Sequence, residues 1–201
     1  MAIDTYHSLL LSSLTEFYKN NPNNRKILYE VVEGKSILSL RILDWFVTHY
    51  SNKNNIIFWI NENTREILEK YPVNNVNQNT HIKKFNLYVE YRAQLQSYTK
   101  MYFDPFRRHE RITFILEHDP LVSIVTTVGQ LNFFKWAIQN NILTYVENNI
   151  QDIEDEMAKY QKDLKNKTKK SFKKNGGTSS TSVIQKNTIL KTPTPCYIKF
   201  D

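Results

Sequence analysis

Cysteine and glycine are both scarce in this sequence. A single cysteine, Cys196, occurs among 201 residues, so the chain can form neither an internal disulfide nor a cysteine-cluster zinc site. The four glycines, Gly34, Gly129, Gly176 and Gly177, provide neither a phosphate-binding loop nor a dinucleotide fingerprint. The common nucleotide-dependent enzymes are therefore not expected. No apolar run approaches the roughly 18 residues needed to span a bilayer, so no membrane partner is expected.

Histidine and acidic residues do not predict a metal site. The five histidines are never spaced three to five positions apart, the spacing of a helical metal pair. The acidic group at 152–156 includes a pair four residues apart that could bind a divalent cation, but a solvated helix face is the commoner meaning of such a group. Cys196 lies in the expected tail without a structured base. The sequence predicts no metal ligand, no cofactor and no catalytic residue.

Positive charge is concentrated at the C-terminal end. Residues 159–201 contain 11 lysines, no arginine and two aspartates, whereas residues 1–158 contain 16 basic and 18 acidic side chains. A cationic segment outside a folded domain binds polyanions by counterion release and needs no shaped site. The sequence therefore predicts non-specific nucleic-acid binding by eight lysines: Lys159, Lys162, Lys165, Lys167, Lys169, Lys170, Lys173 and Lys174.

The composition of the rest of the chain predicts one globular domain of the α+β class. Residues 1–158 are rich in aromatic side chains and long enough to bury a core, which predicts a compact, mainly helical domain with a small β-hairpin. Residues 159–201 are expected to be a basic, largely disordered tail, in which 159–170 could continue the last helix. From residue 171 the composition is typical of a flexible linker. Whether the apolar stretch 183–200 is a docking motif stays open.

The periodicity of apolar residues predicts most of the helices. Helices are expected over 5–20, over 25–33, from a cap at Ser36 or Ser39 through residue 50, over 85–102, and after residue 127 with a break at 140–141. Strands are expected over 55–60 and, as a hairpin, over 111–116 and 121–126. The segment 64–70 is expected to be helical and 72–80 to be a loop. Trp45 and Phe134 are expected to be buried.

One segment of the domain interleaves aromatic and basic residues. Its candidate site residues are Tyr102, Phe106, Arg107, Arg108 and Arg111. Aromatic rings offer faces on which bases stack, and guanidinium groups bind phosphates, a combination used for single strands. Alternatively, Phe103 and Phe106 anchor a proline turn in the core while the arginines pair with Asp104 and Glu110. Both interpretations remain open on the sequence.

Three segments carry a family resemblance. They are 39–50 (SLRILDWFVTHY), 103–112 (FDPFRRHERI) and 126–138 (TTVGQLNFFKWAI). Together they resemble an uncharacterised protein family of the nucleocytoplasmic large DNA viruses, mimivirus relatives included. The resemblance implies a viral protein that acts in the cytoplasm of the infected host cell or is packaged in the virion, and the lysine-rich tail adds the nucleus as a further location. It implies no activity and no catalytic residue.

These observations lead to three hypotheses of function. The favoured one is a non-enzymatic viral accessory or virion-associated protein that contacts nucleic acid through its lysine-rich tail. The alternative is a protein–protein interaction module that docks a viral or host partner through the aromatic segment 85–106. The third is an enzyme whose site the sequence does not disclose.

Overall fold

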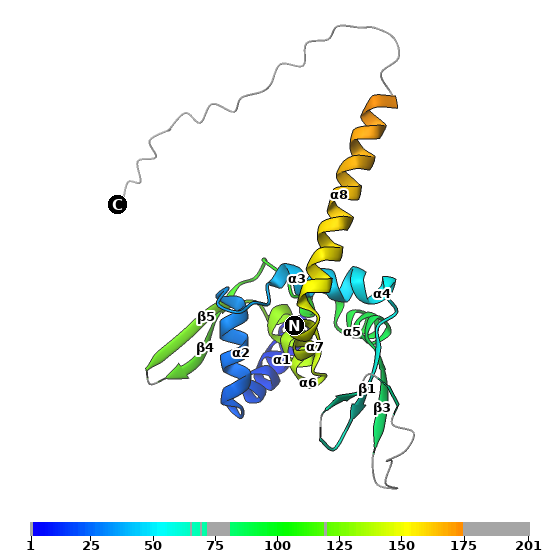
Figure 1. The fold of residues 1–201 in the computed structure, drawn as a ribbon. Coiled ribbons are helices and arrows are strands. Elements are labelled where there is room, and N and C mark those ends of the chain that lie inside the picture. The colour runs from blue at the N-terminus through cyan, green and yellow to red at the C-terminus, as the bar shows by residue number, and fades with distance from the viewer. Residues whose placement is uncertain (1, 65, 69, 72–80, 119, 175–201) are drawn as a thin grey trace, which may run out of the picture. The chain divides into compact units, whose positions relative to one another are not determined.

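The protein has a mainly helical α+β fold, as the sequence predicts. The structure is a computed structural model and describes residues 2–64, 66–68, 70–71, 81–118 and 120–174 (Figure 1). The chain divides into two compact units, Met1–Lys162 and Asp163–Asp201. The predicted loop 72–80 and the tail from residue 175 lie outside the described residues.

The first two helices form a pair joined by a capped turn. Helix α1 spans Ala2–Lys19 and α2 spans Pro22–Val32, which confirms the two helices predicted here. Asn21 caps α2, because its side-chain oxygen accepts hydrogen bonds from the backbone N–H groups of Asn23 (3.0 Å) and Asn24 (3.2 Å). Pro22 occupies the first turn, where its missing N–H has no consequence.

The third predicted helix is interrupted by a π-helical turn. Helix α3 spans Leu40–Trp45, the π-helix η1 spans Phe46–Tyr50, and α4 spans Ser51–Lys53. Ser39 caps α3 by accepting a 3.1 Å hydrogen bond from the backbone N–H of Ile42. Trp45 is 9% exposed, so its predicted burial is confirmed. The sequence pattern predicted one continuous helix and gave no sign of the π turn.

A small three-stranded antiparallel sheet follows, in the order β2-β1-β3. Strands β1 (Ile57–Asn61), β2 (Ile67–Leu68) and β3 (Ile82–Asn86) build it. The helix predicted over 64–70 is wrong, because Ile67 and Leu68 pair with β1 instead. The strand β3 was not predicted, because its partner in β1 lies more than twenty residues away and the local sequence shows no alternation.

The central part of the chain contains a helix and a β-hairpin. Helix α5 spans Leu87–Tyr102 and ends shortly before Pro105. Strands β4 (Ile112–His118) and β5 (Leu121–Thr126) pair antiparallel with an irregularity between Ile115 and Glu117, which confirms the predicted hairpin. The hairpin lies beside α2 in Figure 1.

Three helices complete the described chain. Helix α6 spans Val128–Gln139, α7 spans Ile142–Asn148 and α8 spans Ile150–Lys174. The predicted break at 140–141 is confirmed, since Asn141 has left-handed backbone angles (φ 54°). Asparagine tolerates this conformation better than most residues do.

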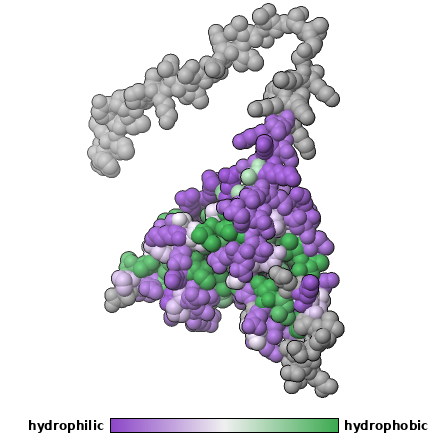
Figure 2. All heavy atoms as spheres, in the orientation of Figure 1, coloured by the Kyte–Doolittle hydropathy of each residue, from purple (hydrophilic) through white to green (hydrophobic). Residues whose placement is uncertain are grey.

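Helix α6 is at the centre of the core. Nine of its residues are buried, and Phe134 is 0% exposed, as the sequence predicts. The aromatic rings of Phe103, Phe133 and Trp136 pack within 5.4–5.8 Å of one another. The Tyr18 hydroxyl donates a buried 2.8 Å hydrogen bond to the carbonyl of Leu131, which joins α1 to α6. The face drawn in Figure 2 is mainly hydrophilic, with hydrophobic patches between the polar side chains.

Candidate anion-binding site

The three arginines of the predicted site line one cavity. Arg107, Arg108 and Arg111 surround a hollow of about 330 Å³ together with Phe106. We call this hollow the arginine cavity. It lies on the segment between α5 and β4. The structure thus brings these four side chains together at one cavity, as the sequence predicts.

The remaining wall of the cavity comes from four other elements. Val32 of α2, Leu40 of α3 and Val125 of β5 supply apolar surface, and Gln130 of α6 supplies an amide. The sequence did not predict these four residues, because each lies outside the segment 106–111 and carries no local signal of a site. Only the tertiary fold brings them to the arginines.

A turn at Asp104 fixes the start of the arginine segment. The Asp104 carboxylate accepts a 2.7 Å hydrogen bond from the backbone N–H of Phe106. Its own backbone N–H donates to the carbonyl of Gly129 at 3.2 Å. A Cβ added at Gly129 would lie 3.0 Å from the Met101 carbonyl oxygen, so a larger residue there would require the neighbouring backbone to shift by a few tenths of an ångström. The turn therefore rests directly on the first turn of α6.

Two buried side-chain amides of α6 form hydrogen bonds with the backbone at this turn. Gln130 donates to the Pro105 carbonyl at 2.9 Å and accepts from the Thr126 hydroxyl at 3.0 Å. Asn132 donates to the Tyr102 carbonyl at 2.9 Å. Both amides are at most 7% exposed, so these bonds satisfy groups that water cannot reach. These hydrogen bonds thus fix the position of the backbone that precedes the arginines.

Only one of the three arginines forms an ion pair with an acidic residue among the described residues. Arg107 forms an ion pair with Glu110 at 3.0 Å, as one of the two sequence interpretations expects. Arg108 lies over the ring of Phe106, 5.1 Å from its centroid, and Arg111 is exposed. Within the described ranges neither of these two side chains has an ion-pair partner. The expected pairing with Asp104 is absent there, since that carboxylate binds the turn.

Tyr102 does not join this cavity. Its side chain is 8% exposed, and its ring contacts those of Tyr6 (5.2 Å) and His7 (5.9 Å) on α1. Tyr102 therefore packs α5 against α1. Of the five candidate residues in the domain, the structure brings four together and places Tyr102 elsewhere.

The tyrosine stripe of α5 is used mainly for packing. Tyr91 is 3% exposed and its ring lies 6.0 Å from that of Phe103 and 6.1 Å from that of Trp136. Tyr98 is half-buried and stacks on Phe103 at 6.2 Å. Burial is the main reason that the pKa of Tyr91 is raised well above its usual range.

The lysine-rich segment 159–174 lies on α8. Lys159, Lys162 and Lys165 are exposed, and in the part of the chain that the structure describes none of them forms an ion pair. Helical backbone continues through Lys167, Lys169, Lys170, Lys173 and Lys174. The backbone of the segment is therefore helical, and its described lysines Lys159, Lys162 and Lys165 are exposed on that helix.

One member of the acidic group at 152–156, Glu156, forms contacts with another part of the fold. Glu156 accepts hydrogen bonds from Lys53 and, at 3.0 Å, from the Asn54 amide. Burial alone would raise the pKa of this carboxyl, but the two hydrogen bonds and the Lys53 charge hold it below its usual range. No group of three histidine, cysteine or acidic side chains is placed to hold a metal among the residues that are described.

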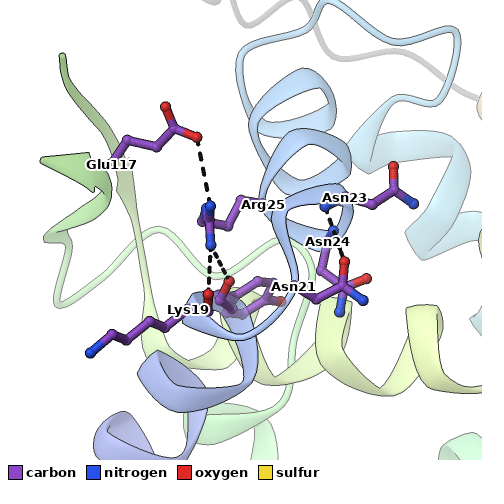
Figure 3. A network of polar contacts seen from close by, with 7 residues as sticks. Lys19, Asn21, Asn23, Asn24, Arg25 and Glu117 are labelled. Carbon is purple, nitrogen blue, oxygen red and sulfur yellow. Dashed lines mark hydrogen bonds and ion pairs between the residues drawn. The ribbon is translucent and has the colours of Figure 1, made fainter. Parts of the chain in front are cut away.

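Arg25 has a structural role. Its guanidinium donates to the carbonyls of Tyr18 (3.0 Å) and Lys19 (2.7 Å) at the C-terminal end of α1 and lies 3.7 Å from the Glu117 carboxylate of β4 (Figure 3). One side chain of α2 thus joins α1 to the hairpin. A cation near helix carbonyls also interacts favourably with the helix dipole.

One half-buried carboxyl, that of Asp44, lies apart from these contacts. Burial raises the pKa of Asp44 on α3, and the negative charge of Asp104 raises it further, while Lys100 and His49 oppose the shift. Asp44 and Asp104 belong to two of the segments that carry the family resemblance. Among the described helices, none is long and apolar enough to cross a membrane.

Comparison with known proteins places the chain in a family. Residues 5–196 match DUF7197, a family of unknown function, and the chain belongs to it. The chain is also similar to "Uncharacterized protein L507" of Acanthamoeba polyphaga mimivirus, at 33% identity over 164 residues. That match covers 80% of this chain and 56% of the mimivirus protein, so the chain spans little more than half the length of this relative. The resemblance to a mimivirus-like family is confirmed. No solved structure matches.

Proposed function

We propose that the protein is a non-enzymatic viral accessory or virion-associated protein that binds nucleic acid through the lysine-rich segment 159–174. The observation that supports this proposal is the exposure of Lys159, Lys162 and Lys165 on α8, where none of the three forms an ion pair among the described residues. Their ammonium groups can therefore contact phosphates. The charge of Lys159 also acts on Glu156, whose pKa it helps to lower.

The physical basis of binding is the release of counterions from the phosphate backbone. Each phosphate that a lysine neutralises on duplex DNA contributes about −0.9 to the slope of log affinity against log salt. The segment 159–174 contains eight lysines. Because ammonium groups on flexible stems do not recognise base edges, binding should be independent of sequence and steeply dependent on salt.

The docking alternative has less support. A partner would need access to the aromatic segment 85–106, yet Tyr91, Tyr102 and Phe103 are buried and Tyr98 stacks on Phe103. The described residues also offer no constellation that favours the enzyme hypothesis. A binding role in the virion or in the infected host cell, including its nucleus, is therefore the proposal that we retain.

The proposal is tested with the full chain and a matched control. The variant Lys159→Gln/Lys162→Gln/Lys165→Gln removes three cationic groups from the segment. The control Lys19→Gln/Lys70→Gln/Lys100→Gln removes three exposed lysines elsewhere, all drawn from the described residues, and changes the net charge equally. Affinity for a fluorescent 20-base-pair duplex is measured at several salt concentrations.

The segment variant should bind more weakly, and its salt slope should be shallower by about 3, one contact for each lysine removed. The control should retain the wild-type slope. Equal losses in both variants would show that only the net charge matters and would contradict the proposal. In purified particles, nuclease treatment should release the protein.

A further inference from the structure

The arginine cavity has the size of a small-molecule subsite and is partly open to solvent. Its volume of about 330 Å³ falls at the lower end of the range of about 300–1,000 Å³ found for ligand pockets. Such a space can hold one nucleotide-sized group but not a duplex. The cavity lies within the unit Met1–Lys162, and its lining includes none of the lysines of the segment 159–174.

The charge around the cavity favours an anion with more than one negative charge. Three guanidinium groups line it, and one of them, that of Arg107, pairs with the carboxylate of Glu110. Two positive charges are thus left over, on Arg108 and Arg111. A phosphate monoester carries close to two negative charges at neutral pH, whereas a diester carries one. Guanidinium groups also match the geometry of phosphate oxygens, because their planar N–H groups bind two oxygens at once.

The apolar part of the wall adds a second requirement. Val32, Leu40 and Val125 face the same hollow as the arginines, and the ring of Phe106 is half-buried beside them. Arg108 covers the Phe106 ring at 5.1 Å, so cation and ring already form one surface. A bare inorganic anion would leave this apolar wall unused. A phosphate attached to a flat aromatic group would cover both parts.

We propose that the arginine cavity binds the phosphate monoester of a nucleotide, with the phosphate on Arg108 and Arg111 and the base against Phe106 and the apolar wall. The nucleotide is either free or the 5′-terminal residue of a single strand. This site is distinct from the lysine-rich segment and does not depend on the proposed function. The two regions differ in kind, because the segment neutralises any phosphate backbone and the cavity selects one end group.

The backbone that presents these side chains is preorganised. Gln130 fixes the Pro105 carbonyl, and the Asp104 carboxylate fixes the Phe106 N–H. Glu110 holds Arg107, whose side chain is 21% exposed, against the turn. Little backbone ordering is therefore needed on binding, and such preorganisation raises affinity.

The test uses the full chain and isothermal titration calorimetry with adenosine 5′-monophosphate (AMP), adenosine and inorganic phosphate. The variant Arg108→Gln/Arg111→Gln should weaken AMP binding by about tenfold for each guanidinium removed, the effect of losing a charged hydrogen bond. The matched control Arg92→Gln/Lys100→Gln removes two exposed cations of α5 and should change AMP affinity by less than about twofold. Equal losses in both would overturn the proposal.

A second variant separates the base from the phosphate. Phe106→Leu keeps apolar bulk but removes the ring, so AMP should bind at least about fivefold more weakly while inorganic phosphate is unaffected. AMP affinity should also fall below pH 6, where the monoester loses its second charge. Adenosine that binds as tightly as AMP would overturn the proposal, and so would a phosphotyrosine peptide that binds more tightly.

Two further comparisons complete the test. A 5′-phosphorylated single-stranded decanucleotide that binds more tightly than AMP would assign a strand end as the ligand, and the reverse order would assign the free nucleotide. The variant Lys159→Gln/Lys162→Gln/Lys165→Gln should leave AMP affinity unchanged. If AMP does not bind but the lysine variant still loses duplex affinity, the cavity proposal fails while the proposed function stands.

Discussion

The buried amide of Gln130 should be essential to the stability of the domain. The variant Gln130→Leu keeps the volume of the side chain but removes its two hydrogen bonds, to Pro105 and from Thr126. Both partners are buried, so the Pro105 carbonyl and the Thr126 hydroxyl would be left without a partner in the site. Each such orphaned group costs about 1–3 kcal/mol.

The expected loss is smaller than the sum of these costs, because the leucine regains some apolar burial and the Thr126 hydroxyl can rotate. We expect the free energy of unfolding to fall by about 2–4 kcal/mol. With a urea m-value of about 2 kcal/mol/M, the midpoint of unfolding should shift by about 1–2 M. Tryptophan fluorescence reports the transition, since Trp136 belongs to the same helix and is buried.

The matched control is Gln96→Leu on the exposed face of α5. This change should alter stability by less than about 0.5 kcal/mol, as ordinary surface substitutions do. If Gln130→Leu behaved like the control, the two hydrogen bonds would contribute nothing net, and the account of a rigid turn beneath the arginine cavity would be refuted. A changed m-value would instead indicate an altered native or denatured state.

Three further outcomes follow from the structure. Phe134→Ala removes a side chain that is 0% exposed and should lower the free energy of unfolding by about 3–5 kcal/mol; a loss below about 1 kcal/mol in urea denaturation would contradict its central position. Gly129→Ala should destabilise the protein by about 1–3 kcal/mol, because the new Cβ would lie 3.0 Å from the Met101 carbonyl; an unchanged melting temperature would contradict the close approach. Asp44→Asn should stabilise the protein at pH 7, because burial and then the charge of Asp104 raise the pKa of Asp44 in the folded state. The ionised carboxylate therefore destabilises the fold above this raised pKa. The gain from the substitution should vanish as the pH falls below the pKa of an aspartate in the unfolded chain, about 3.9. A gain from Asp44→Asn that did not change with pH would contradict this cause.

Local patterns in the sequence predict the helices well and the sheet poorly. Residues 5–20 form a helix because their apolar residues recur at helical spacing, and this information lies within one segment. Ile67 and Leu68 lie in a stretch of good helix formers, yet they become a strand because Trp59 and Ile60 offer a partner. A pairing of this kind depends on residues distant in the sequence and overrides local propensity.

The candidate site also has a part that local sequence predicts and a part that depends on residues distant in the sequence. Arg107, Arg108 and Arg111 are close in sequence, so their grouping could be predicted from the order of residues alone. The apolar wall and Gln130 could not, because each comes from a separate element that only packing brings there. Tyr102 was expected at the site because it is near Phe106 in sequence, but the end of α5 turns its ring toward Tyr6.

The π-helical turn at Phe46–Tyr50 has a consequence for how the chain length can vary. A π turn contains one residue more than an α-helical turn, so it has the form of a single-residue insertion that the helix has absorbed. Deleting one residue there should restore a continuous α-helix without turning the segment that follows, because the wide turn accommodates the extra residue locally. Lys53 and Asn54 should then still reach Glu156. The same deletion within the regular helix α3 would rotate the residues after it by about 100° and remove these contacts.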